Sequence, residues 1–163
     1  MEHPDFIKAA FGKVTITPPI NGVYPDFFFG VPTGVLDDIY ARIAVMQVES
    51  FVPIRSGDKL REDSAKRNEQ SAQPTIVVTV DTLGLGVAEI AELEGAITAA
   101  TGISPDRILI TSSHSHSAPI LCPIDLYSGF SPYFDGLRER VTQLAKELLL
   151  RLEPMKLSFG KSQ

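Results

Sequence analysis

The stretch TIVVTVDTLGLGVAEIAELEGAITAATGISPDRILIT, residues 75–111, decides the fold because it reads as strand, helix and strand in turn. TIVVTV (75–80) is a continuous β-branched run, as expected of a strand buried on both faces. RILIT (107–111) is a second apolar strand. Between them, apolar side chains three or four residues apart mark one face of a helix that ends at Gly102, namely Val87, Ile90, Leu93 and Ile97. Such a unit predicts an α/β domain whose sheet is at least partly parallel.

The flanking sequence extends this pattern in both directions. Phe11 to Thr17 and Tyr40 to Val48 read as two earlier strands. Ser131-Pro132 is a typical helix start, with proline at the first helical position. We expect Pro154 to close that helix and Met155 to Gly160 to form a last strand. The helix carries one apolar stripe, made of Phe134, Leu137, Val141, Leu144 and Leu148. We therefore predict one α/β domain over 1–163, with a mixed, partly parallel sheet and helices packed on it.

Two connecting segments have distinct compositions. Residues 56–73 are polar and charged, which predicts a surface insertion. The segment 22–37 mixes glycine, proline and aromatic residues, and we expect an ordered loop that borders a pocket. Its three adjacent phenylalanines, 27–29, either pack inward or form an exposed binding lip.

The overall composition excludes some classes of protein. The chain has 163 residues with 44% hydrophobic and 21% charged residues, as in ordinary globular proteins. A net charge of −5 without a basic face argues against a nucleic-acid partner. No apolar run approaches the roughly 20 residues of a transmembrane helix. No signal peptide is evident, so we expect a cytoplasmic protein, or an extracytoplasmic one if a leader has been removed. The single cysteine, Cys122, excludes an internal disulfide.

The segment SSHSHSAP (112–119) follows the strand at 107–111 and carries the most specific chemical signal. His114 and His116 are two residues apart, so on an extended backbone their side chains point to the same side. In α/β sheets, ligands bind beyond the carboxyl ends of the strands, which is where these histidines lie. Asp81 occupies the same end of the strand 75–80. If the two strands are neighbours, its carboxylate can hold a histidine ring in one orientation.

Two histidines alone do not make a catalytic zinc site, which uses three protein ligands and one open position. A metal or catalytic role therefore competes with that of a polar loop capping the strand. The only other histidine, His3, lies in the N-terminal segment, which we expect to be frayed. Asp81, Asp125 or a later segment would therefore have to complete the site. Serines surround the histidines, but no G-x-S-x-G nucleophile elbow is present, and a hydrogen-bonding role is favoured for them.

Four stretches, in this order, resemble the N-terminal domain of the neutral/alkaline ceramidases. FGKVTITPP (11–19) is similar to that family's opening strand and its I-T-P-P turn. GVLDDIYARIAVMQ (34–47) resembles its G-x-x-D-x-x-Y-A-R segment. VVTVDTLGL (77–85) and ILITSSHSHSAP (108–119) resemble its V-x-x-D-x-x-G-L strand end and its H-T-H-S-G-P loop. The family's threonine between the histidines is Ser115 here, and its glycine is Ala118.

The resemblance implies a zinc-dependent amidase that hydrolyses the N-acyl bond of a small-molecule or lipid-like amide. It makes His114 a zinc ligand and gives His116 the role of stabilising the reacting carbonyl. Asp81 is assigned to the catalytic site as the residue that orients the histidine loop. The family's other ligands, a histidine, a glutamate and a tyrosine, come from sequence beyond the length of this chain. The resemblance thus predicts only part of a zinc site.

Several explanations of the partial site stay open. The chain is a portion of a longer amidase, a short relative that keeps the fold without a full zinc site, or one copy of a homo-oligomer that completes the site. A non-catalytic binding or scaffold module is the alternative to an enzyme. Metal-dependent amidohydrolases also carry H-x-H at a strand end, but their eight-stranded barrel needs a longer chain.

Overall fold

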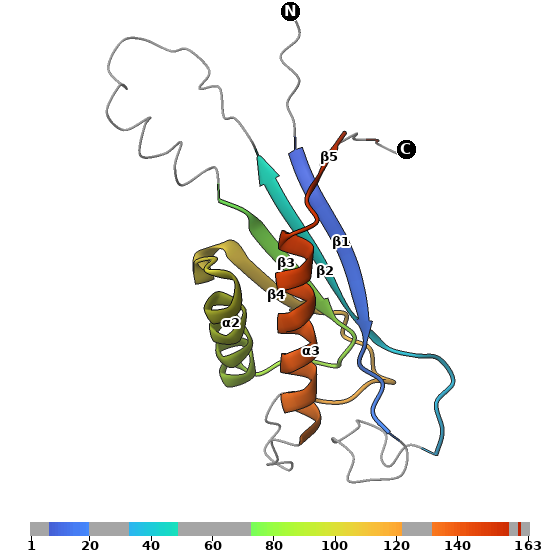
Figure 1. Cartoon of the computed structure of the whole chain (residues 1–163). Helices are drawn as coiled ribbons and strands as arrows, with labels where there is room; N and C mark the ends of the chain where they lie inside the picture. The colour runs from blue at the N-terminus through green and yellow to red at the C-terminus, as the bar shows by residue number, and fades with distance from the viewer. Residues whose placement is uncertain (1–6, 20–32, 49–72, 122–131, 157–159, 161–163) are drawn as a thin grey trace, which may run out of the picture.

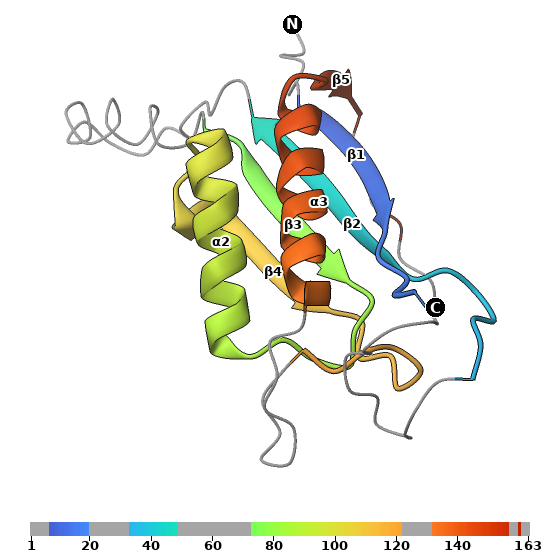
Figure 2. The same cartoon turned by 60° about the horizontal axis from the view of Figure 1, so that its bottom comes forward.

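The computed structural model describes residues 7–19, 33–48, 73–121, 132–156 and 160. Five strands form one sheet in the order β4-β3-β2-β1-β5. The two helices lie side by side on the same face of this sheet (Figures 1 and 2). The elements are β1 (Ile7–Thr15), β2 (Tyr40–Val48), β3 (Thr75–Val80), α2 (Val87–Thr101), the 3-10 turn η1 (Pro105–Arg107), β4 (Ile108–Ser112), α3 (Pro132–Leu149) and β5 (Glu153–Met155).

The sheet is mixed, as predicted. β3 and β4 pair in parallel, with Ile76 beside Ile108 and Val80 beside Ser112. β1 and β2, β2 and β3, and β1 and β5 pair antiparallel. The parallel pair brings the carboxyl ends of β3 and β4 to the same edge, so the residues after Val80 and Ser112 become neighbours.

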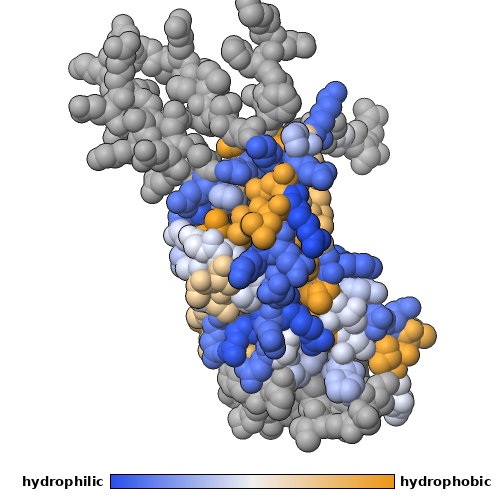
Figure 3. Space-filling view, viewed as in Figure 1, coloured by the Kyte–Doolittle hydropathy of each residue, from blue (hydrophilic) through white to orange (hydrophobic). Residues whose placement is uncertain are grey.

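The core lies between the helices and the sheet. Alternate residues of β3 (Ile76, Val78 and Val80) are completely buried there. Leu93 and Ile97 of α2 meet them, together with the predicted stripe of α3, of which Leu144 is partly buried and the other four members are buried. Hydrophilic side chains predominate on the outer surface of the helices, with smaller apolar patches between them (Figure 3). No helix in the described ranges is long and apolar enough to cross a membrane.

One residue of the expected α2 stripe is placed differently. Val87 is 87% exposed, whereas Glu89 is buried. The buried face is centred on Glu89, Leu93 and Ile97. At about 100° per residue, Val87 lies about 120° round the helix from Leu93, which turns it toward solvent. The prediction that Val87 lies on the buried face was therefore wrong.

The bounds of the first strand and of the last helix differ from the prediction. β1 begins at Ile7 rather than at Phe11 and ends at Thr15. Ala9 and Ala10 are both buried, which breaks the alternation that would have revealed this part of the strand. α3 ends at Leu149, so Pro154 does not close it. Pro154 lies instead in β5, where it is tolerated because β5 is an edge strand.

Several predictions fall outside the described residues. The phenylalanines at 27–29, Cys122 and most of the segments 22–37 and 56–73 are among them. Of the expected final strand, Met155 lies in β5, and residues 157–159 are also outside the described ranges.

Candidate functional site

The two histidines lie together in the loop that follows β4. Their ring centroids are 5.1 Å apart, and the rings meet edge to face at 86°. Both are exposed residues. The two imidazoles therefore form one cluster, although the backbone at His114 is left-handed rather than extended as the spacing argument assumed.

His114 is held in an uncommon backbone conformation. Its φ of 59° makes it the one non-glycine residue with positive φ in the described ranges. The left-handed region costs an L-residue about 1–2 kcal/mol, and such strain often accumulates at functional sites. Its Nδ1 lies 2.7 Å from the carbonyl oxygen of Leu83, in the loop after β3. This contact fixes the direction of the ring.

The contact with Leu83 also determines which ring nitrogen of His114 can bind a ligand. A carbonyl oxygen only accepts hydrogen bonds, so Nδ1 must donate to it. In the neutral ring, Nε2 then keeps its lone pair. A backbone carbonyl on one nitrogen and a metal on the other is the usual arrangement of a metal-binding histidine.

Asp81 lies next to the histidine loop but is engaged elsewhere. One of its oxygens, Oδ2, accepts hydrogen bonds from Nη1 of Arg42 at 2.7 Å and from the backbone N–H of Tyr40 at 3.0 Å. A further hydrogen bond joins its carboxylate to the side chain of Ser113, which directly precedes His114. Asp81 thus connects β2 to the start of the histidine loop.

The surroundings of Asp81 keep its carboxylate ionised. Partial burial would raise the pKa of Asp81, but the hydrogen bonds from Arg42, Tyr40 and Ser113 and the positive charge of Arg42 together lower it below 3.8. Arg42 is also 5.4 Å from the centroid of the Tyr40 ring, and Nζ of Lys13 is 4.0 Å from it. Two cations therefore lie close to the Tyr40 ring.

The loops after β3 and β4 are tied together by backbone contacts. The N–H of Leu83 donates to the carbonyl of Pro119 at 3.1 Å, and Leu85 forms a parallel bridge with Leu121. The buried hydroxyl of Thr82 donates to the Pro119 carbonyl at 2.5 Å. Because the second loop is anchored to the first, the histidines have a fixed position relative to the end of β3.

In the described part of the chain, no group of three or more His, Cys, Asp or Glu side chains is arranged to hold a metal. The expected ligand His114 and its neighbour His116 supply two nitrogen donors, and Asp81 is occupied by Arg42. Asp125, the other candidate, and the third histidine, His3, lie outside the described residues. A catalytic zinc site uses three protein ligands, so the described residues supply fewer ligands than such a site needs.

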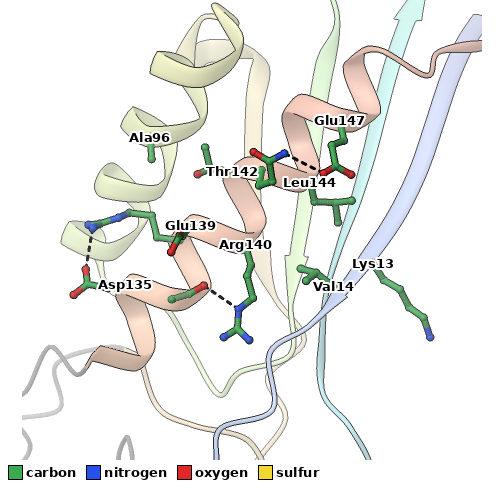
Figure 4. Close-up of a pocket in the computed structure, with 12 residues that line it drawn as sticks. Lys13, Val14, Ala96, Asp135, Glu139, Arg140, Thr142, Leu144 and Glu147 are labelled. Carbon is green, nitrogen blue, oxygen red and sulfur yellow. Dashed lines mark hydrogen bonds and ion pairs between the residues drawn. The ribbon is translucent and has the colours of Figure 1, made fainter.

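A groove along α3 offers no competing chemistry. Lys13 and Val14 of β1 and polar residues of α3 line it (Figure 4). Both of its arginines have local partners: Arg138 pairs with Asp135, and Arg140 donates to the carbonyl of Gly136. No histidine is among the described residues that line it. The histidine loop therefore remains the candidate site.

Comparison with known proteins gives a structural match, which supports the fold. No family model and no curated protein matches the sequence. Among solved structures, neutral ceramidase from Pseudomonas aeruginosa matches with a TM-score of 0.63 at 15% sequence identity. The match covers 93% of this chain and 23% of that structure. The described chain thus has a ceramidase-like fold and spans about a quarter of that protein's length.

Proposed function

We propose that this chain belongs to a zinc-dependent hydrolase that cleaves linear N-acyl amides, with part of the metal site on the loop after β4. One observation carries the proposal. His114 has its Nδ1 fixed by the Leu83 carbonyl and its ring set edge-on to His116, beyond the carboxyl end of a parallel strand. A loop that only caps a strand does not need a histidine with a positive φ whose ring is held by a backbone carbonyl.

Each nearby side chain receives a separate role in this proposal. His114 would bind zinc through Nε2, because Nδ1 is engaged by Leu83. When bound, zinc lowers the pKa of its water and polarises the amide carbonyl. His116 would donate a hydrogen bond to the carbonyl oxygen of the substrate as negative charge develops there. Asp81 acts as a positioning residue, because it contacts Ser113 rather than a reacting atom.

The substrate class follows from the same site and from the fold. A ring nitrogen donor beside a polarised carbonyl suits acyl transfer to water, and the exposed loop is accessible to a small-molecule or lipid-like amide. The structural neighbour is named a neutral ceramidase, which is consistent with an N-acyl amide. The two missing zinc ligands would come from residues outside the described ranges, from further sequence or from a second copy.

Zinc content after exhaustive dialysis tests the proposal. The wild-type chain should retain zinc, His114→Ala should lose it, and Ser117→Ala, on the same loop, should behave as wild type. His116→Ala should keep zinc but lose hydrolysis of an N-acyl amide. Zinc retained equally by His114→Ala would reject the assignment. Zinc in none of the proteins would indicate a binding module that keeps the fold without the metal site.

A further inference from the structure

The second face of the sheet carries exposed apolar side chains. No helix of the described residues covers this face, which we call the open face (Figures 1 and 2). One cross-strand row on it joins Phe11, Ala44, Val77 and Leu109, each the register partner of the next. The row points away from the core because Val77 precedes the core residue Val78, and successive side chains of a strand point to opposite faces. Phe11 is 61% exposed and Leu109 is 58% exposed.

This row contains a hollow at Ala44. The small side chain of Ala44 lies between Phe11 of β1 and Val77 of β3 and leaves space between these two larger side chains. The volume of the hollow is about 410 Å³. Pockets for small molecules span about 300–1,000 Å³ and have mostly apolar walls with a few polar groups. The hollow therefore has the size of a small-molecule site.

The next cross-strand row places two cations at one end of the hollow. Lys13 is the register partner of Arg42, Arg42 is that of Thr79, and all three residues line the hollow. The side chain of Arg42 is half exposed, and its Nη1 pairs with Oδ2 of Asp81 at 2.7 Å. No carboxylate is among the described residues that line the hollow. Because Asp81 offsets one of the two positive charges, this end of the hollow keeps one positive charge in excess.

We propose that this hollow binds a small carboxylate with an apolar body. The body would lie on Ala44 and Val77, and the carboxylate would accept hydrogen bonds from Lys13 and Arg42. A guanidinium has five N–H donors, and within the described part of the chain Arg42 uses its Nη1 for Asp81 and leaves the others for a ligand. The single excess positive charge matches one carboxylate better than a phosphate group, which carries roughly two negative charges.

Zinc plays no part in this binding, so the inference goes beyond the proposed function. No histidine is among the described residues that line the hollow. Metal-free protein is therefore the material for its test. His114→Ala, which removes the proposed zinc ligand, should bind the carboxylate as tightly as the wild-type chain does. Failure of the zinc site and failure of the carboxylate site are thus distinguished.

Titration with octanoate at pH 7, followed by proton–nitrogen NMR of the backbone amides, tests the proposal. Octanoate should bind saturably and shift the signals of residues 11–13, 42–44 and 77–79. 1-Octanol has the same chain length without the charge, and it should bind roughly fivefold more weakly or less tightly still. The proposal is overturned if octanoate does not bind, if octanol binds as tightly, or if the shifts lie elsewhere in the chain.

Two substitutions on the open face test the charge and the hollow separately. Lys13→Gln should raise the Kd for octanoate by about twofold to fivefold, whereas Lys146→Gln, at an exposed position of α3, should leave it unchanged. Ala44→Leu fills the hollow and should abolish saturable binding, whereas Leu109→Ala, in the same row but outside the hollow, should not. Circular dichroism checks that each variant is folded. Unchanged binding by folded Ala44→Leu, or equal losses from the two lysine variants, would overturn the site.

Discussion

Nδ1 of His114 lies 2.7 Å from the carbonyl oxygen of Leu83, so the loop after β4 is oriented by the loop after β3. The two residues are 31 positions apart and meet because β3 and β4 are parallel neighbours. The contact makes the direction of the imidazole a consequence of the sheet topology.

The tautomer of His114 follows from this contact. We expect the neutral ring to carry its proton on Nδ1, since the Leu83 oxygen can only accept. Nitrogen-15 NMR of the histidine side chains, assigned with His114→Gln, measures the tautomer directly. A ring protonated mainly on Nε2 would contradict the assignment and would remove the lone pair proposed to bind zinc.

The backbone at position 114 should respond to glycine in the opposite sense from position 116. Because φ is positive at His114, His114→Gly should be more stable than His114→Ala by about 1 kcal/mol. At His116, which has no positive φ, glycine should be the less stable variant by roughly 0.5–1 kcal/mol. Urea unfolding of the four variants measures both differences. The same order at both positions would show that His114 is unstrained.

The sequence predicted the frame of the site better than its internal contacts. The β-branched run 75–80 and the apolar strand before SSHSHSAP indicated neighbouring parallel strands, and this placed Asp81 and the histidines at one edge. The partner of His114 is a backbone carbonyl, and any residue at position 83 supplies one, so no sequence signal exists for it. The sequence also gives no signal for the left-handed φ of His114, because a histidine does not require this backbone conformation.

Arg42 is a residue whose role the sequence could have revealed. It is the one charged residue in the strand YARIAVMQV, and a charge in an apolar strand calls for a partner. Its partner could not be read from spacing, because Asp81 is 39 residues away. Only the antiparallel register of β2 and β3, which sets Ala41 beside Val80, brings the two together.

The pair of Asp81 and Arg42 predicts a specific loss of stability in acid. Since the folded pKa of Asp81 is lowered, the carboxylate adds stability above its unfolded pKa, near 3.9, and this contribution is lost as pH falls through the folded pKa. Asp81→Asn should lower the free energy of unfolding by about 1–3 kcal/mol at pH 7 and by less below pH 3. Urea unfolding as a function of pH checks this, with the exposed Asp106→Asn as control. If Asp81→Asn loses the same free energy of unfolding at both pH values, the charge of Asp81 does not stabilise the fold.

Two glycines should respond oppositely to an added side chain. A Cβ on Gly12 of β1 would lie 3.0 Å from Cδ1 of Leu144 and 3.2 Å from Leu148, so Gly12→Val should destabilise the fold by roughly 1–3 kcal/mol. A Cβ on Gly95 of α2 would meet nothing within 4 Å, and Gly95→Ala should stabilise by roughly 0.5–1 kcal/mol. Thermal unfolding of the two variants measures whether each substitution raises or lowers the stability of the fold. A stabilising Gly12→Val would mean that α3 does not pack closely on β1.

The Tyr133 hydroxyl joins the first turn of α3 to the chain just beyond β1, where it donates to the carbonyl oxygen of Ile16 at 2.7 Å. Burial raises the pKa of Tyr133 above its usual range, and the nearby charge of Arg140 offsets this only in part, so the hydroxyl stays a donor throughout neutral pH. Tyr133→Phe leaves the Ile16 carbonyl unpaired and should lower the free energy of unfolding by about 1–2 kcal/mol. Tyr40→Phe, which keeps the ring between Lys13 and Arg42, should change it by less. Urea unfolding at pH 7 measures both, and a smaller effect at Tyr133 than at Tyr40 would show that this bond does not anchor α3.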